Sequence, residues 1–162
     1  MKQNGFTLLE LILTIAVLTI FTAAAIPVTK NAVKRQREIE LRTSLRQLRT
    51  AIDRYRQIAD RGLVNRLKIK PSEECMGGQI GTGCYPSDLD VLVDGVELTG
   101  VTTRKIKLLR EIPVDPITGE ADWGKRSFQD DSDSRAWGGQ NVFDVYSKSD
   151  GIALDGTRYR DW

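Results

Sequence analysis

The sequence predicts an α+β fold in which one long amino-terminal helix packs on a small antiparallel sheet. Three observations lead to this prediction. Residues 6–28 are mostly apolar with one charge, and residues 29–61 contain good helix formers without Gly or Pro. The chain after Gly62 is rich in turn signals and has one clear strand-like run. A helix stripe and a sheet face must each be buried, so packing one on the other is the economical arrangement.

Residues 6–28 are long enough to cross a bilayer as a helix, since about 20 residues at roughly 1.5 Å each span about 30 Å of hydrocarbon. Glu10 is the only charge in this stretch. An ionised carboxylate in lipid costs about 2.5 kcal/mol or more, so its presence needs a reason. A cut between Gly5 and Phe6 supplies one, because the new α-amino group of Phe6 in an adjacent subunit would pair with Glu10 in a packed bundle.

Other features of this segment favour different interpretations. Ala23-Ala24-Ala25 suit an ordinary signal peptidase, which would remove residues 1–25. The basic residues from Lys30 onward would be cytoplasmic by the positive-inside rule. A discarded signal, however, gives no reason for Glu10.

Residues 29–61 predict a continuation of the helix with a narrow apolar stripe and an Arg-rich opposite face. The stripe consists of apolar residues at four- and three-residue steps: Leu41, Leu45, Leu48, Ile52, Tyr55 and Ala59. Residues 30–70 hold thirteen Lys or Arg against four Asp or Glu, a net charge of +9, whereas residues 71–162 carry −7. A basic run can bind nucleic acid, but we favour a helix face in solvent, balanced by acidic residues of this chain or its neighbours, and expect no nucleic-acid partner.

The two cysteines, Cys75 and Cys84, lie nine positions apart with a Gly-rich span between them. Since the chain has no histidine and no further cysteine, the usual zinc sites and a catalytic Cys-His pair are excluded. The span can bend enough to bring the thiols together, so a loop-closing disulfide in an oxidising compartment is favoured over two free thiols in a reducing cytoplasm.

The segment after Gly62 predicts short elements joined by loops. We expect a short helix in residues 87–93, a second in residues 105–110, a constrained loop over 112–119 and a strand at 142–147. About 100 residues is small for an enzyme with a sizeable pocket, and no spacing singles out a pair of catalytic carboxylates. We therefore predict no enzymatic activity, with a signal-cleaved secreted enzyme or binding protein as the minor alternative.

The leader Lys2-Gln3-Asn4-Gly5, followed by Phe6-Thr7-Leu8-Leu9-Glu10, resembles the cleavage motif of type IV pilins and pseudopilins. The resemblance implies that a prepilin peptidase cuts after Gly5 and methylates the amine of Phe6. It implies a leader over 1–5, a transmembrane or filament-core helix over 6–28, its amphipathic continuation over 29–61 and a globular body over 62–162. It also implies a single-pass protein of the bacterial inner membrane with the body in the periplasm.

The carboxy-terminal body resembles the major pseudopilin of type II secretion systems, the protein G type. The resemblance lies in Tyr85-Pro86, the segment 109–119, the run 143–147 and Asp150-Gly151. It implies a structural subunit of a periplasmic pseudopilus that polymerises with itself and meets minor pseudopilins and the inner-membrane secretion assembly platform. It also implies a calcium ion near Asp150 and Asp155, although each aspartate would equally suit a turn. A major or minor pilin of a type IV pilus is the alternative.

Overall fold

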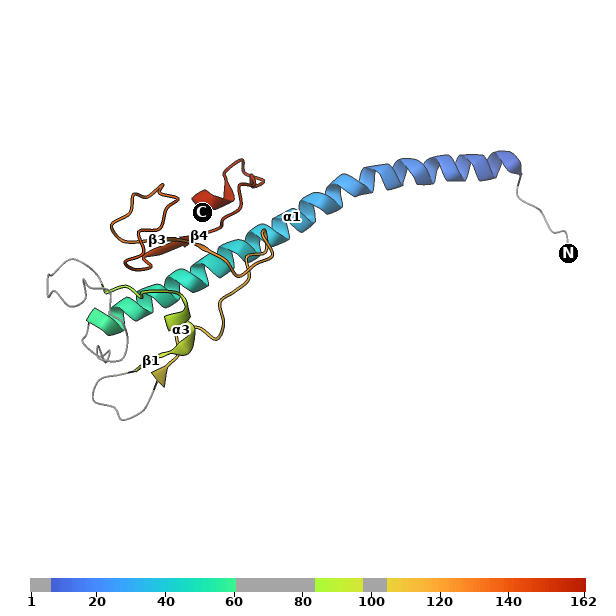
Figure 1. The fold of residues 1–162 in the computed structure, drawn as a ribbon. Helices are drawn as coiled ribbons and strands as arrows, with labels where there is room; N and C mark the ends of the chain where they lie inside the picture. The colour runs from blue at the N-terminus through green and yellow to red at the C-terminus, as the bar shows by residue number, and fades with distance from the viewer. Residues whose placement is uncertain (1–6, 61–83, 98–104) are drawn as a thin grey trace. The chain divides into compact units, whose positions relative to one another are not determined.

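The computed structural model describes residues 7–60, 84–97 and 105–162, without the side chains of residues 23–28, 60 and 97. The chain divides into two compact units, Met1–Arg37 and Glu38–Trp162. Along the chain the elements are α1 (Leu8–Asp60), α3 (Asp90–Asp94), β1 (Val96–Glu97), β2 (Lys105–Ile106), β3 (Gly124–Arg126), β4 (Asp144–Tyr146) and the 3-10 helix η1 (Tyr159–Asp161) (Figure 1). The predicted α+β class, with a long helix and small antiparallel sheets, is confirmed.

Helix α1 contains 53 residues, close to the predicted span of 6–61. Its first turn is closed by Thr7, whose carbonyl accepts from the N–H of Glu10 at 3.1 Å and whose hydroxyl accepts from the same N–H at 3.3 Å. The predicted last residue of the helix, Arg61, lies outside the described residues. All six residues of the predicted apolar stripe are buried, so the stripe is confirmed as the core face of the helix.

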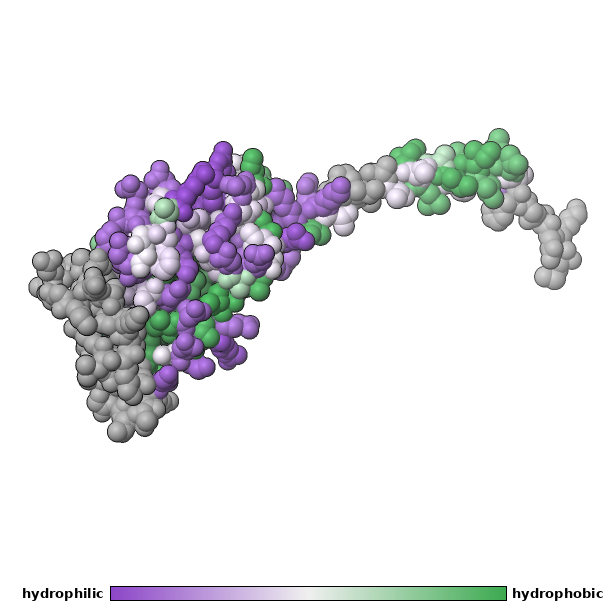
Figure 2. Space-filling view, in the orientation of Figure 1, coloured by the Kyte–Doolittle hydropathy of each residue, from purple (hydrophilic) through white to green (hydrophobic). Residues whose placement is uncertain are grey.

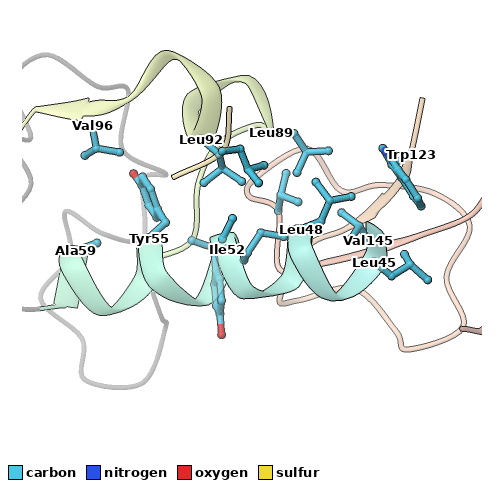
Figure 3. Close-up of a cluster of buried hydrophobic side chains, with 14 of the residues drawn as sticks. Leu45, Leu48, Ile52, Tyr55, Ala59, Leu89, Leu92, Val96, Trp123 and Val145 are labelled. Atoms are coloured by element: carbon cyan, nitrogen blue, oxygen red, sulfur yellow. The ribbon is translucent and has the colours of Figure 1, made fainter. Parts of the chain in front are cut away.

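The core of the second unit lies between this stripe and the elements that follow it. Figure 3 shows Leu48 and Ile52 of α1 facing Leu89 and Leu92 around α3. Trp123, which is 1% exposed, closes the same cluster on the side of the strands and donates its indole N–H to the carbonyl of Pro113 at 2.8 Å. The only polar group of this large side chain, its indole N–H, therefore has a hydrogen-bond partner.

The strands form two separate antiparallel pairs. In the first pair Val96 lies opposite Ile106, and in the second Lys125 lies opposite Val145. The predicted strand over 142–147 is observed as β4, whereas its partner β3 was not predicted. A β-carbon at Gly124 would lie 2.3 Å from the ring of Tyr146, so the packing of this ring over β3 favours glycine at that position.

The predicted helix over 105–110 is wrong. Lys105 and Ile106 pair in β2, and the next residues use their backbone groups on α3: the N–H groups of Leu108 and Leu109 donate to the carbonyl of Leu92 at 3.0 and 2.9 Å. These bonds give the carbonyl of Leu92, near the end of α3, its hydrogen-bond donors. If residues 105–110 formed a helix, their N–H groups would not be available to this carbonyl. The expected short helix in 87–93 occurs slightly later as α3.

The predicted constrained loop over 112–119 is built around one buried carboxylate. Asp115 is fully buried and accepts from the N–H of Ile117 at 2.8 Å and from the hydroxyl of Ser147 at 2.6 Å. Its own carbonyl accepts from the N–H of Gly119, which has φ of 81° and so suits glycine. The loop is thereby tied to the end of β4.

Candidate functional site

The beginning of α1 presents an apolar surface. Its large apolar side chains are between 43% and 78% exposed; they are Leu8, Leu9, Leu11, Ile12, Leu13, Ile15, Val17, Leu18, Ile20 and Phe21. Figure 2 shows that the visible face of this part of the helix is mostly green, that is, hydrophobic. Burying one such side chain fully stabilises by about 1.5–3 kcal/mol, so a surface of this size indicates a site of association.

The hydroxyl groups within this surface are satisfied by the helix itself. Thr14 donates to the carbonyl of Leu11 at 2.9 Å, Thr19 to that of Ile15 at 2.7 Å, and Thr22 to that of Leu18 at 2.7 Å. No threonine hydroxyl here therefore has to find an external partner when the surface is buried. Threonine at these spacings was not singled out from the sequence, because the benefit depends on the helical geometry.

Glu10 is exposed in the first turn of α1, and within the described residues its carboxylate has no hydrogen bond or ion pair. Acidic residues are favourable near the amino-terminal end of a helix. Burial of the surrounding apolar surface would leave this charge without water, and a cation close to Glu10 would then stabilise it. The predicted cation is the α-amino group of Phe6 in an adjacent subunit, and both Phe6 and the leader 1–5 that ends at Gly5 lie outside the described residues.

Within the part of the chain that the structure describes, no helix is both long and apolar enough to cross a membrane. The span predicted over residues 6–28 includes residue 6 and the side chains of 23–28, which lie outside the description, so it stays a prediction.

At the other end of the chain, the segment after β4 is attached to α1 through Glu38. This residue is 9% exposed, and one of its oxygens, Oε1, accepts both the N–H of Leu154 at 2.8 Å and the hydroxyl of Tyr159 at 3.0 Å. Burial, reinforced by Glu38, raises the pKa of Tyr159 to about 12. Glu38 was not predicted as a functional residue. Glu38 lies three residues before Leu41 and so on the same face of the helix as the apolar stripe, and this position could have indicated that its carboxylate is buried.

Two arginines of α1 hold the same segment. Arg49 donates to Asp144 Oδ1 at 2.7 Å and to the carbonyl of Trp162 at 2.6 Å. Arg42 lies over the ring of Trp162, with 3.8 Å from its guanidinium carbon to the ring centroid, and forms an ion pair with Asp155 at 3.2 Å. Part of the basic charge of α1 is thus matched by acidic residues of the same chain.

The two aspartates predicted to bind calcium each have a partner within the chain, and the calcium site stays a prediction. Asp150 pairs with Arg160 at 2.6 Å. Asp155 accepts from the hydroxyl and N–H of Thr157 at 2.6 and 2.9 Å, and these bonds, with Arg42 as a lesser cause, lower the pKa of its carboxyl. Calcium needs six to eight oxygens, yet no group of three or more acidic or cysteine side chains that could hold a metal ion occurs in the described ranges.

Cys84 is 7% exposed and is bonded in a disulfide. Its predicted partner, Cys75, lies outside the described residues, so the pairing of these two cysteines stays a prediction.

Comparison with known proteins gives two likenesses. Residues 1–26 match the prokaryotic N-terminal methylation motif. Over 112 residues the chain is 30% identical to the type IV major fimbrial protein FimA of Dichelobacter nodosus, an alignment that covers 69% of this chain and 64% of that protein. The chain therefore spans slightly less than two thirds of this curated relative. No solved structure matches the chain.

These likenesses confirm that the amino-terminal segment carries a type IV pilin-like methylation motif, as predicted. They also support the predicted structural, non-enzymatic role, since one is to a processing motif and the other to a fimbrial protein. Neither likeness is specific to the protein G type of pseudopilin, and the type IV pilin alternative is the better supported of the two.

Proposed function

We propose that this chain, with its type IV pilin-like methylation motif, is a subunit of a type IV pilus that polymerises through the beginning of α1. The observation that carries the proposal is the exposed apolar surface from Leu8 to Phe21, which contains Glu10, a carboxylate without a partner among the described residues. A protein that worked alone in water would leave this surface exposed at a large cost in free energy. Copies packed side by side bury it.

The proposed cut between Gly5 and Phe6 provides the cation that Glu10 needs. A helical turn contains 3.6 residues, so the new amino group would lie about one turn before Glu10. If two copies are offset by about that distance, the amine of one copy meets the carboxylate of the next. A mispaired register leaves both charges buried without partners, which typically costs about 3–5 kcal/mol. Methylation by a prepilin peptidase keeps the charge of the amine and so preserves the pairing.

We place the body outside the cytoplasm, with residues 6–28 as the membrane anchor before assembly. The disulfide of Cys84 supports an oxidising compartment, where such bonds persist. A membrane anchor would also keep the apolar surface out of water before the filament forms. The likeness to a fimbrial protein favours a type IV pilus over a type II secretion pseudopilus.

Intact-mass measurement of the mature protein, followed by electron microscopy of the filaments, tests the proposal. We expect loss of Met1–Gly5 with one added methyl group. Gly5→Ala should block the cut, whereas Glu10→Gln should be cut normally but assemble poorly. Glu40→Gln, at another exposed carboxylate of α1, is the matched control and should assemble as the unaltered chain does. A mature protein lacking residues 1–25, or normal filaments from Glu10→Gln, would refute the proposal.

A further inference from the structure

The exposed side of α1 carries arginines around two neighbouring depressions, which together are named the arginine groove. Two open depressions with volumes of about 480 and 420 Å³ lie on either side of Arg46 and Thr50, which line both. The groove is defined by the arginines that line the two depressions: Arg42, Arg46, Arg49, Arg54 and Arg110. Asp53 is the one acidic residue among the lining side chains, so the groove carries a clear excess of positive charge.

Only part of this charge is used within the chain. Arg42 and Arg49 already pair with carboxylates of the carboxy-terminal segment. Arg46, Arg54 and Arg110 are exposed, and their guanidinium groups make no hydrogen bond or ion pair with any described residue. Three forked donors along one groove favour a ligand with more than one carboxylate or phosphate.

An acidic turn at residues 131–133 has the complementary charge. Asp131 and Asp133 are exposed, and their carboxylates have no partner among the described residues. The loop between β3 and β4 that carries them is fixed by hydrogen bonds among its own residues. The carboxylate of Asp130 accepts the N–H of Ser127 at 2.7 Å, and the fully buried Asn141 accepts the N–H of Phe128 at 3.0 Å. A loop already ordered in this way loses little conformational entropy on binding.

We propose that the acidic turn of one copy of the chain docks in the arginine groove of the next copy. The two patches consist of different residues, so the contact is heterologous: each copy that is added leaves one free groove and one free turn. Repetition of a contact of this type produces an open helical filament when the rotation between copies does not close a ring. The inference rests on the proposed function and specifies one contact of the filament outside the apolar part of α1.

Charge reversal in the full-length chain tests the contact. Arg46→Glu and Asp131→Arg should each raise the subunit concentration needed for assembly by about tenfold, because each replaces an attraction by a repulsion. The variant that carries both changes restores opposite charges and should recover most of the loss. Lys107→Glu and Asp94→Arg make the same charge changes on exposed residues outside the two patches and should assemble normally. Higher salt should weaken assembly of the unaltered chain more than that of either single variant.

The outcomes separate this inference from the proposed function. If the unaltered chain forms no filaments, the proposed function fails and the contact fails with it. If filaments form but the single reversals assemble like their controls, or the double variant is no better than the singles, only the contact is overturned.

A second measurement does not depend on how well the reversed variants fold. A chain with both Arg46→Cys and Asp131→Cys should give a ladder of covalently linked multimers when its filaments are oxidised, and either change alone should give none. Absence of the ladder from well-formed filaments overturns the contact.

A DNA-binding assay tests the other possible occupant of the groove. If the unaltered chain retards a duplex DNA oligonucleotide, and Arg46→Glu abolishes this binding while it assembles normally, the contact is overturned and the groove binds nucleic acid instead.

Discussion

Replacing Glu38 by Ala removes the one oxygen that accepts from both Leu154 and Tyr159. The hydroxyl of Tyr159 is buried, so water cannot replace the lost acceptor, and an unsatisfied buried donor costs about 1–3 kcal/mol. The bond from Leu154 is only partly buried and should contribute less, about 0.5–1.5 kcal/mol. We therefore expect a loss of about 2–4 kcal/mol in the free energy of unfolding, which lowers the melting temperature by roughly 10 °C at about 4 °C per kcal/mol for a body of this size.

Thermal unfolding of the full-length chain in detergent, followed by circular dichroism, measures this effect. Glu38→Gln keeps Oε1 as an acceptor for both donors and should lose less than half as much as Glu38→Ala. Tyr159→Phe removes one of the two donors, so in that background Glu38→Ala should cost about 1 kcal/mol less than in the unaltered chain. The reasoning is refuted if Glu38→Ala melts within about 2 °C of the unaltered chain, or if Glu38→Gln costs as much as Glu38→Ala.

Three further predictions concern buried groups and metal ions. Asp115→Ala should lower the free energy of unfolding in urea by about 2–4 kcal/mol, because the buried hydroxyl of Ser147 loses its acceptor. Asp115→Asn keeps an acceptor oxygen and should lower it clearly less, so equal losses would contradict this role. Adding calcium or a chelator should leave the melting temperature unchanged, since Asp150 and Asp155 already have cationic partners, and a calcium-dependent rise would show a site that these contacts do not explain. The pKa of Tyr159 is raised from 10.0 to about 12, so the folded state holds this proton more tightly than the unfolded state does. Its contribution to stability is complete below pH 10 and is lost as the pH rises to about 12, so Tyr159→Phe should flatten part of the fall in melting temperature in that range; an unchanged pH profile would contradict it.

Much of α1 could be predicted because its signals are local. The spacing of Leu41, Leu45 and Leu48 alone places them on one face of a helix, and all three are buried. Glu10 also stands out locally, as the single charge in an apolar stretch, but its role in assembly stays a prediction. Asp115 shows the limit of such signals. The sequence around it predicts a loop, but its burial depends on Ser147, which lies 32 residues further along the chain.

The wrong helix over 105–110 has the same cause. Lys105, Ile106 and Leu108 have no strong local preference that excludes a helix, and their observed conformation depends on partners in β1 and α3. Strand β3 was missed for a related reason: Gly124 weakens a strand signal in the sequence, but it is favoured by the ring of Tyr146 packed against it.

The acidic residues near the end of the chain show what the sequence determines and what only the tertiary structure determines. The order of residues establishes that acidic side chains lie near the end of the chain, and that a processing motif and an apolar segment lie at its beginning. Which cations meet those acidic side chains depends on contacts between distant residues. Arg42 reaches Asp155 across 113 positions of sequence, and Glu38 reaches Tyr159 across 121. Packing of the carboxy-terminal segment on α1 brings these groups together, and the electrostatic energy depends on their distance in space, which the order of residues does not specify.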